Sequence, residues 1–500
     1  MTRKILAAVA AALLCACAFG THADAQTKPP SAAINPNEPG HVWKLCDGYG
    51  GPSLSGDGMT SYAATLFLFI PSKGGDTFHK NPVAGREGVE ACDEVLRDPL
   101  IVDRYAMRRA SLLRAKAIHQ IAAKDPQGAL ATLDLADAVR VGDNDVYYRR
   151  SFAVGLQFVR AYALAEAGDK PKARLVALQA RAQRPYSSDL ALAAAILMNR
   201  VGEGDEAYRA IQDIARFDPY KIDMLYGQSL KSGRVDEAII LFPQLLPPKD
   251  FPASPGYDFQ IVQTNLENRA RGEIFWARRA ASTAVAAASL GRQQEAIDIL
   301  KAARRRLQTA IDTAPPIELN GRLVKTKYLP DVAKDLTALM SQRGLPVLDK
   351  ADREVAMLSG APPIKPPISE SSPLGPTEAE LSTLLARLPE IELKDRMLAY
   401  QKLNPKFFGG TYDGYMEESG PVPGTVKIKT RSHAATAAVV EEVALLRAAN
   451  IAREQGKPGF LVLDRTVTQH TMSVSTYPGI PGAPGADGYS ADLTLSLIHI

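Results

Sequence analysis

Apolar positions recur with the period of an amphipathic helix through the middle of the chain, from about residue 104 to about residue 310. A short sequence motif, called here the glycine motif, recurs in this stretch and has a glycine five positions before an alanine. Its four copies are at Gly168 and Ala173, Gly202 and Ala207, Gly233 and Ala238, and Gly291 and Ala296. A weaker copy has Lys124 five positions before Ala129. Glycine tolerates the positive φ with which many helices end, and a small alanine lets the next helix pack closely. The pattern predicts pairs of helices joined by tight turns.

The spacing of these alanines indicates a known type of repeat. Successive reference alanines, from Ala129 to Ala296, are 44, 34, 31 and 58 residues apart. A period of 34 residues is that of the tetratricopeptide repeat, and the chain resembles that family, most closely in residues 152–219. The resemblance implies that residues 104–345 form an α-solenoid, which the unequal intervals make a degenerate one. An unrelated helical bundle with glycine-rich turns is the alternative.

The same resemblance selects a set of candidate binding residues. In tetratricopeptide repeats the first helix of each pair lines the concave face, and the corresponding positions here are Arg114, Phe158, Tyr162, Asp189, Tyr220, Asp223 and Arg278. A groove of mixed apolar and charged character suits an extended peptide or a partner helix. The simpler interpretation of each residue is packing between helices for the aromatic side chains and a solvated face for the charged ones.

The first 25 residues have the pattern of a secretory signal peptide. Arg3 and Lys4 precede an apolar run of about 15 residues, too short to span a bilayer, and small residues precede a cleavage site before Gln26. Cys17 lies in a segment that resembles a lipobox, so a lipid anchor there is one alternative, and an uncleaved anchor is another. We expect a periplasmic or secreted protein of a Gram-negative bacterium with no membrane span after cleavage, or else an outer-membrane lipoprotein.

Signal cleavage would leave two cysteines, Cys46 and Cys92. An even number of cysteines in an oxidising compartment favours one disulfide, with two buried thiols as the alternative. Residues 26–103 are expected to form an N-terminal extension in which a helix near residues 86–99 caps the repeats. The disulfide would then hold the segment around Trp43 against that cap.

Six prolines between residues 361 and 376 indicate a semi-rigid extended linker, which we assign to residues 346–376. A proline-rich ligand docked in a groove is the alternative. Beyond the linker, residues 436–455 have an apolar helical face, and residues 460–463 and 466–476 are typical of strands. Residues 377–494 are therefore expected to form a small α+β module. The pattern in residues 446–465 resembles small modules at the C-termini of bacterial envelope lipoproteins.

The fold class expected is mostly α, a degenerate tetratricopeptide-like α-solenoid followed by that module. Residues 495–500 match one reading frame of a transposon adapter used in sequencing libraries. We expect them to be an artefact that truncates the module, with the native chain continuing beyond it.

Composition and the absence of known motifs argue against several classes of function. Apolar residues make up 46% of the chain and charged residues 23%, which excludes disorder throughout. A net charge of +4 gives nucleic-acid binding no electrostatic support. The chain carries no Walker A, His-Glu-x-x-His, Cys-x-x-Cys or Gly-x-Ser-x-Gly motif, so we expect no catalytic residue, cofactor or metal ligand. Asp464 and His470 are more typical of a solvated turn and a solvent-facing strand position.

We therefore expect a non-catalytic scaffold that binds a protein or peptide partner in the cell envelope. The alternative is a periplasmic enzyme or ligand-sensing protein whose site lies in the C-terminal α+β module.

Overall fold

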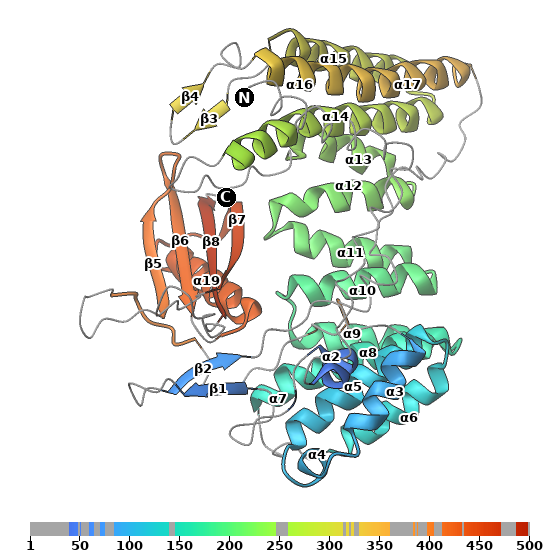
Figure 1. Ribbon diagram of the computed structural model, residues 1–500. Coiled ribbons are helices and arrows are strands. Elements are labelled where there is room, and N and C mark those ends of the chain that lie inside the picture. Colours follow the sequence, from blue (N-terminus) through green and yellow to red (C-terminus); the bar gives the residue numbers. More distant parts are fainter. Residues whose placement is uncertain are drawn as a thin grey trace, which may run out of the picture.

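The computed structural model describes residues 40–48, 51, 60–64, 71–75, 85–139, 146–246, 259–313, 317–319, 322–324, 330–360, 384–385, 388, 398–404, 413–432, 435–471 and 487–498. The signal peptide with its cleavage site before Gln26, the lipobox-like Cys17 and the proline-rich residues 361–376 lie outside this part of the chain. The described chain is mostly helical, with a small antiparallel sheet near its C-terminus (Figure 1). At this level the expected fold class is confirmed.

The described residues of the N-terminal part form three short helices and two paired strands. Its elements are α2 (His41–Asp47), β1 (Thr60–Ala64), β2 (Pro71–Gly75), α3 (Arg86–Val95) and α4 (Pro99–Asp103). Strands β1 and β2 pair antiparallel, which the sequence did not indicate. Helix α2 packs on α3, and α3 packs on the first long helix of the next region.

Residues 106–357, called here the helical array, contain helices that follow one another in pairs. They are α5 (Ala106–Ala122) with α6 (Pro126–Asp137), α8 (Phe152–Glu166) with α9 (Lys170–Gln183), α10 (Ser188–Val201) with α11 (Gly204–Ala215), α12 (Ile222–Lys231) with α13 (Val235–Leu241), α14 (Phe259–Ser289) with α15 (Gln293–Thr313), and α16 (Pro330–Arg343) with α17 (Leu345–Met357). Between them lie α7 (Val146–Arg150), the short 3-10 turns η1 (Pro219–Lys221) and η2 (Phe242–Gln244), and the strands β3 (Ile317–Leu319) and β4 (Arg322–Val324), which pair antiparallel. Each pair packs together and against its neighbours in chain order, so the array extends in one direction (Figure 1).

The turns between paired helices have the positive φ that the glycine motif predicts. The four glycines all have positive φ: Gly168 89°, Gly202 92°, Gly233 73° and Gly291 81°. The matching alanines, Ala173, Ala207, Ala238 and Ala296, are completely buried. Lys124, which replaces the glycine in the weaker copy, also has a positive φ of 63°. The turn therefore keeps its backbone shape even where the residue is unsuited to it.

Two apolar clusters fill most of the array. One runs from α5 to α12, and the other joins α14, α15, α16 and α17. Tyr226 bridges the two regions: it is completely buried on α12, and its hydroxyl donates to the carbonyl of Arg279 on α14 at 2.9 Å. A tyrosine is accommodated here, at a position where other pairs have alanine, because its polar end finds a partner.

One predicted boundary is wrong. The linker was assigned to residues 346–376, but α17 extends from Leu345 to Met357. Pro346 lies in the first turn of that helix, where a proline costs no hydrogen bond. Leu348, Ala351 and Val355 are buried along one face of α17, so the helical array continues through residue 357.

The C-terminal module is a four-stranded antiparallel sheet with one helix on a face (Figure 1). Its elements are β5 (Gly414–Ser419), β6 (Thr425–Ser432), α19 (Ala437–Glu454), β7 (Gly459–Thr471) and β8 (Asp487–Ile498), and the strand order is β5-β6-β8-β7. Ile428, Val462 and Ala444 belong to the core between sheet and helix. Residues 495–498 belong to β8, where they pair with β7, and residues 495 and 496 also pair with β6. Among the described helices, none is both long enough and apolar enough to cross a bilayer.

Candidate interaction face of the helical array

Segments from beyond the linker lie against the helical array at two places. The first is the C-terminal module, which stands beside α10, α11 and α12 (Figure 1). The second is formed by leucines at positions 384, 385 and 388, which pack into the α5–α12 cluster. Together the residues of the array that meet these segments are called here the contact face.

A buried arginine joins the module to the array. Arg465 of β7 donates through Nη1 to Asp218 Oδ2 at 2.5 Å and through Nη2 to Ser188 Oγ at 3.3 Å. Its Nη2 also pairs with Glu441 of α19 at 2.5 Å. Because Asp218 side-chain exposure is only 7% and that of Arg465 is 13%, this ion pair lies largely out of water. Breaking such a pair leaves an uncompensated buried charge, whereas an exposed pair contributes little.

The carboxylates around Arg465 are held in an unfavourable environment. Burial raises the pKa of Glu441, while the charge and hydrogen bond of Arg465 act in the opposite direction. The nearby Asp189 and Asp218 raise that pKa further, because like charges disfavour ionisation. Asp218 has a second role, since its Oδ1 accepts from the backbone N–H of Tyr220 and so begins η1.

A β-bulge directs Arg465 toward this site. Strand β7 pairs Val462 with Leu495 and Asp464 with Thr494, so Leu463 has no partner in the ladder. Before the bulge Val462 packs into the core under α19, and after it Val467 packs against the same helix. Strict alternation from Val462 would have placed Arg465 on the opposite face.

Three further contacts flank the arginine. Arg184, at the end of α9, donates to Glu442 Oε1 through Nε at 3.0 Å and Nη2 at 2.7 Å. Burial raises the pKa of Tyr220 to about 12, and the charge and hydrogen bond of Asp464 raise it as well. Phe217 of the array packs against the apolar core of the module. The module is therefore held by ionic, polar and apolar contacts together.

The second contact brings leucines from residues 384–388 onto the array. Leu385 and Leu388 are each only 1% exposed and belong to the apolar cluster that runs from α5 to α12. Arg114 of α5 donates through Nη1 to the carbonyl of Leu388 at 3.2 Å. Its guanidinium lies over the ring of Phe152, 4.2 Å from the centroid. Burying two leucine side chains contributes on the order of 3–6 kcal/mol before the cost of ordering the segment.

The structure distributes the seven predicted face residues unevenly. Arg114 and Tyr220 meet the C-terminal segments as just described, and Asp189 lies close enough to Glu441 to raise its pKa. Asp223 instead pairs with Arg279 Nε at 2.7 Å and so ties α12 to α14 within the array. Arg278 is exposed on α14.

For two residues the prediction of a surface position is wrong. Phe158 and Tyr162 on α8 are completely buried. The hydroxyl of Tyr162 donates to the carbonyl of Ala193 on α10 at 2.9 Å. Helix α8 has α6 and α9 as well as α10 against it, so these aromatic side chains pack between helices and do not line an open groove.

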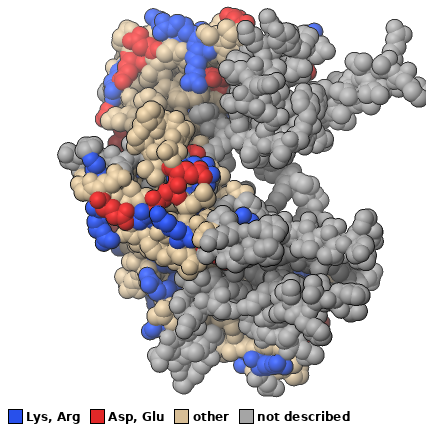
Figure 2. Space-filling view, turned by 90° about the vertical axis from the view of Figure 1, so that its left-hand side faces the viewer, with Lys and Arg blue, Asp and Glu red and all other residues tan. Residues whose placement is uncertain are grey.

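Among the described residues, no group of three or more histidines, cysteines, aspartates and glutamates is placed to hold a metal ion. Asp464 lies within β7, not in a turn, and its carboxylate accepts from the backbone N–H of Arg465 at 2.9 Å. Although β7 includes His470, the side chain of that residue lies outside the description. Figure 2 shows acidic and basic side chains interspersed on one face, with no large patch of a single sign among the residues coloured there.

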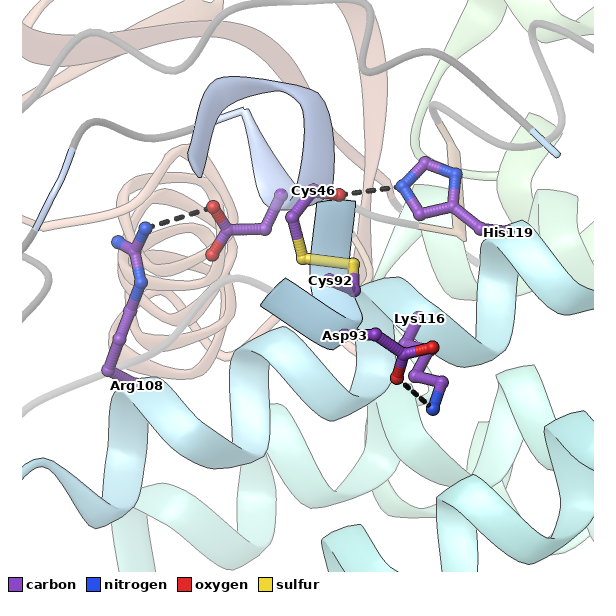
Figure 3. The surroundings of a disulfide bond; sticks show 7 residues. Cys46, Cys92, Asp93, Arg108, Lys116 and His119 are labelled. Carbon is purple, nitrogen blue, oxygen red and sulfur yellow. Dashed lines mark hydrogen bonds and ion pairs between the residues drawn. A yellow bond between two sulfur atoms is a disulfide. The ribbon is translucent and has the colours of Figure 1, made fainter. Parts of the chain in front are cut away.

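The N-terminal cap contains the two cysteines. Cys46 of α2 is bonded to Cys92 of α3, with their Cα atoms 4.8 Å apart. Figure 3 shows two side chains of α5, Arg108 and His119, on either side of this disulfide. Arg108 Nη2 pairs with the buried Asp47 at 2.9 Å, so the disulfide holds α2 to α3 and this ion pair holds α2 to α5 of the array.

His119 of α5 is a buried titratable group that contacts the N-terminal cap. Its Nε2 donates to the carbonyl of Cys46 at 2.7 Å, and Nδ1 has no hydrogen-bond partner among the described residues. Burial lowers the pKa of His119, although the contacts with the carbonyls of Cys46 and Leu45 raise it. A Cβ at Gly88 would lie only 2.3 Å from Nδ1, so the glycine makes room for the neutral ring.

No protein-family model matches the chain, and no curated protein matches it significantly.

Proposed function

We propose that the protein is a non-catalytic scaffold of the periplasm, a degenerate tetratricopeptide-like α-solenoid that binds protein or peptide partners in the cell envelope. The observation that carries this proposal is the contact face. It holds two segments remote in sequence, one by the ion pair between Arg465 and Asp218 and one by buried leucines with an arginine on a backbone carbonyl. A helical surface that binds segments of its own chain by these contacts has the chemistry to bind segments of another protein.

The location rests on the sequence. A cleaved signal peptide with Arg3 and Lys4 before a short apolar run directs export, and a disulfide between Cys46 and Cys92 is typical of an oxidising compartment. Mass spectrometry of the exported protein tests this, with Gln26 as the expected N-terminus. An acylated Cys17 would show that the protein is a lipoprotein. An intact Met1 would contradict the prediction that the signal peptide is cleaved during export.

Partner binding is tested at a residue that the module leaves accessible. Arg278 is exposed on α14, and Arg305 is exposed on the partner helix α15. The purified exported chain, with Arg278→Glu and with Arg305→Glu as the matched control, is used to capture proteins from envelope extract after brief chemical crosslinking. We expect the wild type and the control to retain the same protein and Arg278→Glu to lose most of it.

Equal capture by all three chains would show that binding does not use the predicted face. Capture of nothing beyond background by the wild type would count against the scaffold itself.

A further inference from the structure

We propose that the site around Arg114 and Phe152 binds a short amphipathic helical segment of a partner protein, one whose leucines follow the pattern of residues 384, 385 and 388. In the resting chain the protein's own segment occupies that site. This proposal rests on the proposed scaffold function and names the ligand chemistry of one of its sites. The segment that occupies the site shows which chemistry it accepts.

The contact is not imposed by chain connectivity. Leu388 lies 274 residues after Arg114 and well beyond Met357, the last residue of α17. Leu385 and Leu388 are nevertheless as deeply buried as the core of the array. A segment so remote is buried here because the site accommodates it.

The polar contact is of a kind that any peptide satisfies. Arg114 donates to a backbone carbonyl, that of Leu388, at 3.2 Å. Arg114 is itself only 7% exposed, and its guanidinium is stacked over Phe152. Tyr148 of α7 borders the same place, since its ring centroid is 5.8 Å from that of Phe152 and the charge of Arg114 acts on its hydroxyl. The arginine thus positions a main chain, and the leucines supply the specificity.

The leucine spacing defines the ligand. Residues 384 and 385 are helical, and the spacing of positions 384, 385 and 388 is the spacing of residues on one face of a helix. Leu385 and Leu388 are buried, whereas Leu384 is half-buried at the edge of the contact. A ligand therefore needs one turn of helix with leucines at these three positions.

The resident segment competes with any partner for this site because it belongs to the same chain. Attachment to the same chain gives a segment an effective concentration on the order of millimolar. Against such a competitor, a free peptide with a dissociation constant of about 10 µM binds roughly 100-fold more weakly than it would to an empty site. A partner with the same pattern thus binds only when it is abundant or has additional contacts elsewhere on the array.

The experiment empties the site and supplies the segment in trans. A fluorescein-labelled synthetic peptide with the sequence of residues 380–392 is titrated, by fluorescence anisotropy, with the full exported chain and with its Leu385→Ser/Leu388→Ser variant. We expect the variant to bind the peptide about 100-fold more tightly than the wild type. The matched control, Leu175→Ser/Leu446→Ser, replaces two leucines that are 54% and 50% exposed and should bind like the wild type.

A second peptide, with serine in place of both buried leucines, should bind none of the chains. If the double variant does not fold, as judged by circular dichroism, Leu388→Ala takes its place with an expected gain of roughly 10-fold. The proposal is overturned if the emptied chain binds the peptide no more tightly than the wild type, or if it binds both peptides equally.

Two other outcomes are distinguishable. In the first, the wild-type chain dimerises as its concentration rises, while the double variant stays monomeric. That result would show that the site binds the same segment of a second copy, and it would overturn the proposal that the ligand is a different protein. In the second, the emptied chain does not bind the peptide, but the capture experiment with Arg278 succeeds. That result would overturn the proposed peptide site and would still support the scaffold function.

Discussion

Arg465 and Asp218 form a 2.5 Å ion pair between residues 247 positions apart, one on β7 and the other at the first residue before η1. This single pair lies where the C-terminal module meets the helical array. Because Glu441 shares the same guanidinium, Arg465 neutralises two carboxylates from two different parts of the chain.

The first prediction concerns this arginine. Arg465→Met keeps the apolar stem but leaves Asp218 and Glu441 without their cation, and removing one partner of a buried pair typically costs about 3–5 kcal/mol. Hydrogen exchange should show lost protection in β7 and η1 and unchanged protection in α15. Arg453→Met, an exposed change on α19, is the control and should leave the pattern of the wild type. Unaltered protection at η1 in Arg465→Met would mean that the pair does not hold the module.

The second prediction compares two turns with the same backbone shape. Gly168 and Lys124 both have positive φ, and an added Cβ at Gly168 would meet no atom within 4 Å. Gly168→Ala should therefore destabilise the protein by about 1–2 kcal/mol through backbone strain alone. Lys124→Gly should stabilise it by up to about 1 kcal/mol, because it relieves the same strain at some cost in chain entropy. Urea unfolding measures both, and a change of the same sign in the two variants would refute this explanation of the turns.

The third prediction is a dependence of stability on pH. Burial lowers the pKa of His119 below its usual value of 6.5, so between the folded and unfolded pKa values the unfolded chain binds more protons. The contribution of the neutral ring is fully present above pH 6.5 and is lost as the pH falls toward the folded pKa. Thermal unfolding between pH 7.5 and pH 5 checks this in comparison with His119→Gln, which keeps a donor for the carbonyl of Cys46. The variant should lose part of the pH dependence of the wild type, and identical slopes would exclude His119 as its source.

The fourth prediction concerns the redox state of the cap. Cys46 and Cys92 should resist alkylation in the exported protein until a reductant is added. A bridge between residues 46 positions apart contributes about 4 kcal/mol in the chain-entropy model. Cys46→Ala/Cys92→Ala should therefore unfold at lower denaturant concentration, with the first loss of hydrogen-exchange protection in α2 and α3. Two freely alkylated thiols in material from the periplasm would contradict the prediction.

The sequence predicted the features of this fold that depend on local chemistry. A glycine at the end of a helix and an alanine five residues later are constraints that adjacent residues impose, so the turns at Gly168, Gly202, Gly233 and Gly291 were predictable. The helix at residues 437–454 and its stop at Gly456, which has a φ of 64°, follow from the same kind of pattern. The boundary between the helical array and the linker is predicted wrongly at Pro346, because a proline in the first turn of a helix and a proline in a linker look alike in sequence.

The contact face depends on what a sequence does not display. Nothing near Asp218 indicates that its partner is Arg465, and the side of the sheet on which Arg465 falls is decided by the unpaired Leu463. Phe158 and Tyr162 are at repeat positions that usually line the concave face, but here they are buried between successive helices. Only their surroundings distinguish a buried aromatic side chain from an exposed one at such a position.

The unpaired Leu463 makes this module more sensitive to length than to composition. Leu463 is 38% exposed, so many substitutions there would be tolerated. Deleting it would leave Val462 and Arg465 two positions apart, so plain alternation would keep both on the face toward α19. One residue inserted between Asp464 and Arg465 would instead exchange the two faces of everything that follows and send Arg465 toward solvent. Gain of one codon at this point would thus separate the two halves of the protein without altering a single residue that joins them.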